Sequence, residues 1–146
     1  MRVRSAGLLL ALALALAMAV TGCTGTALYD PPGDGAPKAR LSIETMLGGN
    51  GEHGDGQSTV AMLKVDGKRL AETGGKQRVF LEPGEHSVAF SADHQGTLRF
   101  GTLSHDFQAG ADYLIWVGEG EGDKPYSAVL VPAGSGVVNI YDETLF

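Results

Sequence analysis

Residues 78–90 read RVFLEPGEHSVAF, and this stretch decides the fold class. Its apolar side chains recur at every second position on both sides of a Pro-Gly pair, and a two-residue period is typical of half-buried β-strands. Proline fixes φ at about −65° and glycine accepts positive φ, so the pair favours a tight reversal. The stretch predicts two short strands, the first with Val79 and Leu81 on one face and the second with His86, Val88 and Phe90 on one face.

The same alternation continues through the chain after residue 38. Turn-forming pairs such as Asp66-Gly67 separate the apolar segments. Glycine makes up 22 of the 146 residues, and each glycine inside a helix costs about 1 kcal/mol relative to alanine. The sequence therefore predicts an all-β domain, a small antiparallel β-sandwich or partly open barrel of seven to nine strands. We expect strands at residues 41–47, 60–65, 68–70, 78–82, 86–90, 98–100, 113–117, 127–131 and 137–141.

The N-terminus has the order of a removable export signal. Arg2 and Arg4 precede an apolar run at residues 6–20, and small or polar residues follow it. As a helix this run would rise about 22 Å, less than the roughly 30 Å hydrocarbon core of a bilayer. We therefore expect a helical signal peptide at residues 1–22 and not a permanent transmembrane span.

Residues Val20-Thr21-Gly22-Cys23 resemble the lipobox of bacterial lipoproteins. The resemblance implies lipid attachment to the sulfur of Cys23 and cleavage just before it; the alternative is an ordinary secretory signal with a cysteine at its cleavage site. Cys23 is the only cysteine, and a lone thiol in an exported chain would be open to oxidation. Thr24 follows it, and by resemblance to lipoprotein sorting the lack of Asp there implies an outer-membrane anchor with the domain facing the periplasm.

The mature chain divides into a tether and one domain. Residues 24–38 contain three prolines, three glycines and few large apolar groups, so they can bury little surface to offset their ordering entropy. We expect the lipidated Cys23 and a flexible tether at residues 23–38 to hold the β-sandwich domain, residues 39–146, off the lipid surface. After residue 22 the chain has nine Lys and Arg against seventeen Asp and Glu, a net charge of −8 that argues against a nucleic-acid partner.

The segments VDGK at residues 65–68 and VFLEPGEHSV at residues 79–88 resemble the small β-modules of bacterial envelope proteins typified by the PEGA domain. The shared features are a V-D-G hairpin and an L-x-P-G-x-H-x-V reversal. The segment FQAGADY at residues 107–113 is similar to a step in related lipoproteins of uncharacterised function. The resemblance implies a β-module and transfers no catalytic residue to this chain.

Each of the four histidines is next to an acidic residue in the sequence. The pairs are Glu52-His53, Glu85-His86, Asp93-His94 and His105-Asp106. Imidazole nitrogens and carboxylates bind Zn²⁺ and similar ions, so His86, His94 and His105 with Asp93 or Asp106 would form a metal or small-ligand site if the turns bring them together. None of the pairs has a spacing such as H-x-H or H-E-x-x-H. The alternative interpretation places them in solvated turns, with His86 on an apolar strand face, and predicts no metal and no cofactor.

The serines offer no recognisable nucleophile. Ser87, Ser104 and Ser127 lie outside any G-x-S-x-G turn. Ser104-His105-Asp106 contains the three residue types of a hydrolase triad, but neighbouring residues of an extended strand point to opposite faces. We therefore expect no catalytic residues and no enzyme.

These features predict a non-enzymatic, lipid-anchored envelope protein whose β-domain binds another envelope protein or the cell-wall polymer. Such a module is expected to expose an apolar or aromatic patch on one sheet face. The alternative is a periplasmic metal- or small-ligand-binding lipoprotein that uses its His and acid pairs.

Overall fold

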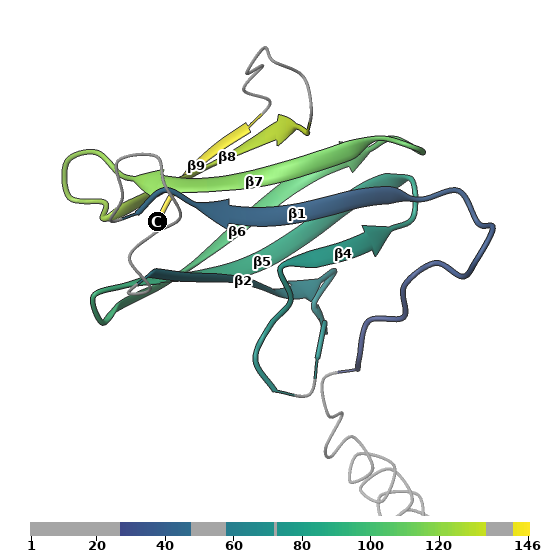
Figure 1. The fold of residues 1–146 in the computed structure, drawn as a ribbon, viewed down its shortest axis with the longest axis horizontal. Helices are drawn as coiled ribbons and strands as arrows, with labels where there is room; N and C mark the ends of the chain where they lie inside the picture. The colour runs from purple at the N-terminus through teal and green to yellow at the C-terminus, as the bar shows by residue number, and fades with distance from the viewer. Residues whose placement is uncertain (1–26, 48–57, 72, 134–141) are drawn as a thin grey trace, which may run out of the picture.

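The computed structural model describes residues 27–47, 58–71, 73–133 and 142–146, which are coloured in Figure 1. The predicted signal peptide, Cys23, the glycine-rich segment at 48–57 and the strand predicted at 137–141 lie outside the described residues. In the described ranges no helix is long and apolar enough to cross a membrane.

Two β-sheets pack face to face, which confirms the predicted all-β class and favours the sandwich over the barrel (Figure 1). The five-stranded sheet has the order β4-β1-β7-β8-β9, formed by Arg78–Leu81, Ala39–Thr45, Asp112–Glu119, Tyr126–Pro132 and Asp142–Leu145. The four-stranded sheet has the order β3-β2-β5-β6, formed by Lys68–Arg69, Ser58–Val65, Gly84–His94 and Thr97–Phe107. β4 and β3 therefore lie at one side of the sandwich, and β9 and β6 at the other.

One strand pair departs from the predicted antiparallel arrangement. β1 runs parallel to β7, with Leu41 opposite Tyr113, whereas the other strand pairs of the described chain are antiparallel. Parallel neighbours need a long crossover connection, and the chain makes it by passing through the four-stranded sheet between β1 and β7. The local two-residue period contains no information on this direction.

The Pro83-Gly84 reversal carries the chain from one sheet to the other. β4 ends at Leu81 in the five-stranded sheet, and β5 begins at Gly84 in the four-stranded sheet. Gly84 has a φ of +128°, where a side chain would be strained. Both predicted strands are present, but they do not pair with each other, because the turn connects two layers.

The core between the sheets consists of the side chains that alternate in the sequence. Leu41 and Phe90 are fully buried, one from each sheet, and no polar or charged residue of the described chain is classed as buried. The largest fully buried side chains also include Phe107, Ile43, Leu47, Met62, Leu81, Leu103, Ile115 and Leu130. Apolar burial is therefore the main term that holds the two layers together.

Part of the segment predicted as a flexible tether contacts the domain, at residues 27–29 and at Lys38. Leu28 forms a parallel bridge with Arg69 of β3, and the Tyr29 backbone N–H donates to the Arg69 carbonyl at 2.7 Å. The Tyr29 ring packs against the core, and its hydroxyl donates to the Phe80 carbonyl at 3.1 Å. One aromatic ring and several backbone hydrogen bonds offset the ordering entropy of this Pro- and Gly-rich segment.

Candidate functional site

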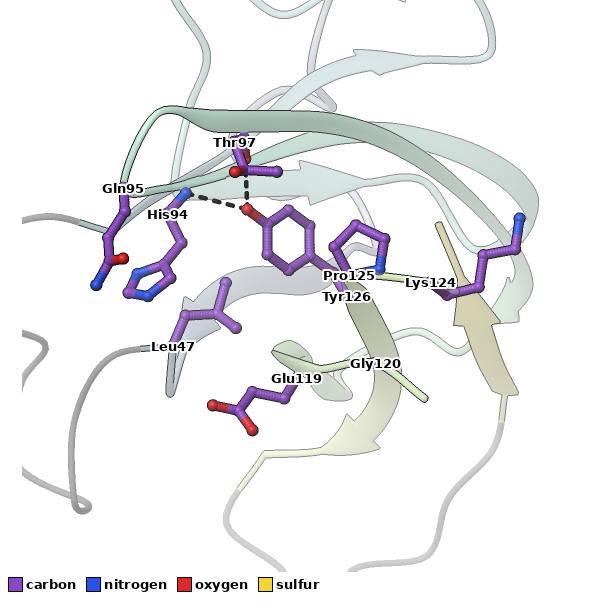
Figure 2. A pocket seen from close by; sticks show the side chains of 9 residues that line it. All are labelled: Leu47, His94, Gln95, Thr97, Glu119, Gly120, Lys124, Pro125 and Tyr126. Carbon is purple, nitrogen blue, oxygen red and sulfur yellow. Dashed lines mark hydrogen bonds between the residues drawn. The ribbon is translucent and has the colours of Figure 1, made fainter. Parts of the chain in front are cut away.

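An open hollow of about 420 Å³ lies where β5 turns into β6 (Figure 2). Its lining comes from this hairpin, the segment after β1 and the β7–β8 connection, and consists of Leu47, His94, Gln95, Thr97, Glu119, Gly120, Lys124, Pro125 and Tyr126. Figure 2 shows the Lys124 side chain extending away from the His94 imidazole. The charged groups of the hollow therefore do not converge on one point.

Tyr126 of β8 fastens this hairpin to the opposite sheet. Its ring is buried, and its hydroxyl accepts a hydrogen bond from the His94 backbone N–H at 3.2 Å and donates to the Thr97 carbonyl (Figure 2). Gln95 and Gly96 form the turn between those two residues with φ of +52° and +80°. Positive φ at both central residues is the geometry of a type I′ turn, which suits the twist of a hairpin. The hydroxyl thus has a structural role at the floor of the hollow.

Ser58 and His94 form a pair at the edge of the hollow. The Ser58 Oγ lies 2.6 Å from His94 Nδ1 and donates its own proton to the Leu47 carbonyl at 2.8 Å. A hydroxyl has one proton, so Nδ1 must be the donor in the contact with Ser58. A histidine that donates to serine cannot remove the serine proton, and the arrangement lacks the geometry of a nucleophile with its base. Sequence reasoning missed the pair because Ser58 and His94 are 36 positions apart.

His86 is held at both ring nitrogens at the other end of β5. Nδ1 lies 2.7 Å from Asp66 Oδ2, and Nε2 lies 2.9 Å from the Glu82 carbonyl oxygen. Both partners only accept hydrogen bonds, so the form of His86 that satisfies both is the imidazolium. Asp66 also accepts a hydrogen bond from the Ser87 backbone N–H at 2.9 Å and occupies the predicted turn with Gly67 at φ of +51° and +76°.

Two groups on this side of the molecule have shifted pKa values. Burial of the Asp66 carboxyl opposes ionisation, but hydrogen bonds from Ser87 and His86 and the charges of His86 and Lys68 outweigh it and lower the pKa of Asp66. Burial, together with the negative charges of Glu82 and Asp66, raises the pKa of the Tyr29 hydroxyl. Tyr29 lines an open hollow of about 240 Å³ together with Leu70 and Phe80.

The metal site considered from His86, His94 and His105 is not assembled. His86 and His105 lie opposite each other on β5 and β6, but both nitrogens of His86 have protein partners. His94 is eight residues farther along β5, about 26 Å away at the rise of a strand. Within the described ranges no group of three His, Cys, Asp or Glu side chains could hold a metal ion. His53 lies outside those ranges.

The Ser104-His105-Asp106 segment forms part of β6 and not a turn. The His105 ring faces inward, 5.2 Å from the Phe107 ring and 5.4 Å from the Tyr113 ring between centroids. Ser104 and Asp106 are exposed on the opposite face of the strand. The three side chains therefore alternate between the two faces of β6.

Asp93, the other carboxylate considered for a metal, lies opposite Thr59 and Leu98 in the ladder. Its Oδ1 is buried and has no hydrogen-bond partner among the described residues. Asp106 instead accepts a hydrogen bond from the Gln108 side chain at 3.2 Å. The two carboxylates are 13 positions apart on different strands and share no contact with a common histidine nitrogen.

An apolar patch lies on the outer face of the four-stranded sheet, the face turned away from the five-stranded sheet. Phe100 and Leu98 of β6 expose 65% and 46% of their surface. Ser91 lies opposite Phe100, and Ala61 lies opposite Ser91, so the side chains directly across the sheet from the ring are small; Asp93 lies opposite Leu98. We call Phe100, Leu98, Ser91 and Ala61 the Phe100 patch. The sequence predicts that Leu98 and Phe100 share a face, and the structure shows that this face is the solvent side.

Comparison of the chain with protein-family models, curated proteins and solved structures finds no match.

Proposed function

We propose that this chain is a lipid-anchored cell-envelope protein without enzymatic activity, whose β-sandwich binds another envelope protein or the cell-wall polymer. The anchor is the lipid on Cys23, by resemblance to bacterial lipoproteins, and the membrane is the outer membrane. The binding surface is the Phe100 patch. Large exposed aromatic side chains that no described residue covers are typical of interaction surfaces.

The exposure of Phe100 is the observation that carries the binding proposal. Phe90 and Phe100 lie on paired strands, yet Phe90 is fully buried whereas Phe100 is 65% exposed. Exposing most of a phenylalanine forgoes the roughly 1.5–3 kcal/mol that full burial of such a side chain contributes. A partner that covers the ring would recover this free energy. β6 also lies at the edge of its sheet, so a partner can reach the ring from the side.

Site-specific photocrosslinking in intact envelopes tests this binding surface. A photoreactive amino acid at Phe100 is expected to give a discrete adduct, and the same amino acid at Met46, a 48% exposed residue after β1, is the matched control. The adduct should weaken when Leu98 is replaced by serine. A product that muramidase digestion reduces to a sharp band identifies the cell-wall polymer, and a product of fixed mass identifies a protein. Equal adducts at Phe100 and Met46 would contradict the proposal.

The Cys23→Ser variant tests the anchor separately. Removal of the acyl acceptor is expected to abolish labelling by a fatty-acid analogue and to shift the protein out of the outer-membrane fraction, either into the soluble fraction or, uncleaved, into the inner membrane. Two acyl chains contribute about 0.8 kcal/mol per buried CH₂, so their loss cannot be compensated by surface contacts alone. A wild-type protein that takes up no label contradicts the lipoprotein proposal.

A further inference from the structure

The basic residues of the mature chain gather at one side of the sandwich. Nine Lys and Arg follow residue 22. All except Arg99 and Lys124 lie on β3, on β4, between these two strands, at the adjoining end of β2, at the start of β1 or on the segment that leads into β1. Arg40 forms an ion pair with Asp112 at the start of the β1–β7 pair. The other six, which we call the basic edge, are Lys38, Lys64, Lys68, Arg69, Lys76 and Arg78.

The basic edge is continuous through short contacts. Lys64 lies opposite Arg69 in the β2–β3 pair, and the backbone of Lys76 bonds to that of Met62 on β2. Lys76 and Arg78 line a hollow of about 240 Å³ together with Tyr29 and Phe80. The Lys38 ammonium lies 4.9 Å from the centre of the Phe80 ring. These contacts link the N-terminal segment, the edge of the four-stranded sheet and β4 into one surface.

Two exposed apolar side chains accompany these charges. Leu28 is 48% exposed and Phe80 is 40% exposed. Aromatic and aliphatic side chains next to Lys and Arg form the composition that suits a membrane interface, where apolar groups enter the headgroup region and cations contact anionic lipids.

Acidic residues on this side are fewer than the basic ones. Four of them are described: Asp30 and Asp34 on the N-terminal segment, Glu82 directly after β4, and Asp66, which is paired with His86. The remaining unpaired acids of the described chain lie mostly on β5, β6 and the β7–β8 connection, at Glu85, Asp93, Asp106, Glu119, Glu121 and Asp123. Among the described residues the six basic residues of this side therefore outnumber four acidic ones, although the net charge of the chain after residue 22 is −8.

The N-terminal segment is attached to this same side. The Ala27 carbonyl accepts a hydrogen bond from the Arg69 backbone N–H at 2.9 Å, and Leu28 forms a parallel bridge with Arg69 of β3. Only four residue steps separate Ala27 from Cys23, a reach of at most about 14 Å in a fully extended chain. An acylated Cys23 would therefore hold the basic edge next to the lipid headgroups.

We propose that the basic edge docks on an anionic phospholipid surface and orients the sandwich on the bilayer. The inference rests on the proposed lipidation of Cys23. In this arrangement the domain does not stand off the membrane. It lies on the bilayer with its β3–β4 side against the headgroups. Phe100 and Leu98 then lie at the side of the sandwich farther from the bilayer, because β6 is at the opposite edge of the four-stranded sheet from β3.

Fluorescence quenching on vesicles tests the orientation. Acylation leaves the chain without a free thiol, so a fluorophore reacts only with an introduced cysteine, either Thr73→Cys beside the basic edge or Ser104→Cys on β6; both positions are exposed. The full lipidated protein is reconstituted in phosphatidylcholine vesicles, with or without about one-third phosphatidylglycerol, that carry quencher-labelled lipids. We expect stronger quenching at residue 73 than at residue 104, only with phosphatidylglycerol, and a decrease in high salt.

A charge-reversal pair supplies the matched control. Two double variants are compared. The first combines Lys68→Glu with Lys76→Glu on the basic edge. The second combines Arg99→Glu with Lys124→Glu away from it, and it changes the net charge by the same amount. Each basic residue lost from an anionic surface lowers the docked-to-undocked ratio by about fivefold, so the first pair is expected to lower it by about 25-fold or more and the second pair to leave it nearly unchanged.

Any of three results would overturn the docking proposal. These are equal quenching at residues 73 and 104, quenching that does not depend on phosphatidylglycerol, and equal effects of the two double variants. Mass spectrometry of the wild-type protein separates this failure from that of the proposed function. An acylated protein without preferred orientation refutes docking alone, whereas a protein without acyl mass refutes the lipoprotein assignment and the docking with it.

Discussion

The two sides of the sandwich are built differently. The β6–β9 side has the eleven-residue strands β5 and β6, paired along their whole length, and an aromatic cluster in which Phe146 lies 5.2 Å from Phe90 and 5.7 Å from Tyr126 between ring centroids. The β3–β4 side has strands of two and four residues joined by an irregular segment and carries most of the basic residues. Regular strand pairing and apolar packing therefore stabilise the β6–β9 side. The β3–β4 side has shorter strand pairs and isolated backbone contacts, and it differs from the other side in its basic side chains.

Phe90→Ala should have the largest effect and would show how much stability the β6–β9 side supplies. Phe90 is fully buried against Gly101 and Phe146, and its truncation leaves a cavity. We expect a loss of about 3–5 kcal/mol in the free energy of unfolding, measured by urea denaturation. Phe100→Ala on the paired strand is the control, with an expected change within about 0.5 kcal/mol. Similar losses for the two variants would show that the exposed ring is part of the core.

Gly75→Ala tests the β3–β4 side. A Cβ on Gly75 would lie 2.5 Å from the Met62 carbonyl oxygen and 2.7 Å from the Ala61 Cβ, so the segment between β3 and β4 would have to move off β2. We expect a loss of about 1–3 kcal/mol in thermal or urea unfolding. Gly33→Ala, where a Cβ meets nothing within 4 Å, is the control and should be neutral or slightly stabilising. A neutral Gly75→Ala would show that this segment does not need its close approach to β2.

Tyr126→Phe and Tyr29→Phe compare one hydroxyl from each side. Removal of the Tyr126 hydroxyl leaves the Thr97 carbonyl and the His94 N–H without this partner in a part-buried site, and we expect a loss of about 1–2 kcal/mol. The Tyr29 hydroxyl makes a single exposed hydrogen bond to Phe80, so its removal should cost less than about 0.5 kcal/mol. Hydrogen exchange at Gln95 and Gly96 should increase only in the Tyr126 variant. The reverse order would contradict the assignment of the β5–β6 hairpin as the more firmly held side.

The pH dependence contributed by Asp66 should be the smallest effect. The folded protein lowers the pKa of Asp66, so ionised Asp66 stabilises the fold above its unfolded value of about 3.9, and this contribution is lost as the pH falls through the folded value. The Asp66 side chain is 41% exposed, and solvent screening limits the contribution to less than about 1 kcal/mol. Urea unfolding of Asp66→Asn between about pH 2 and pH 6 should therefore give a flatter acid limb than wild type.

Asp123→Asn, in the exposed β7–β8 connection, is the control for that titration and should keep the wild-type slope. An acid limb in Asp66→Asn that matches wild type would show that the turn contributes nothing to the pH dependence.

The sequence by itself determined the strands and their faces, because a two-residue period depends only on the local backbone. Leu41, Ile43, Val88 and Phe90 are buried as that period predicts, and Asp66-Gly67 forms the expected turn. Most of the strands appear where the alternation places them.

Only the tertiary structure decided which strands are neighbours and which face meets the core. The parallel β1–β7 pair, the passage of the chain between sheets at Pro83-Gly84, the pairing of His86 with Asp66, and the packing of Tyr29 all join residues far apart in the chain. Phe90 is buried and Phe100 is exposed, although both lie in strands with the same alternation. The two-residue period shows which side chains share a face, but it does not show which face the other sheet covers. That choice depends on the free energy of packing two whole sheets together, to which no short segment contributes enough on its own.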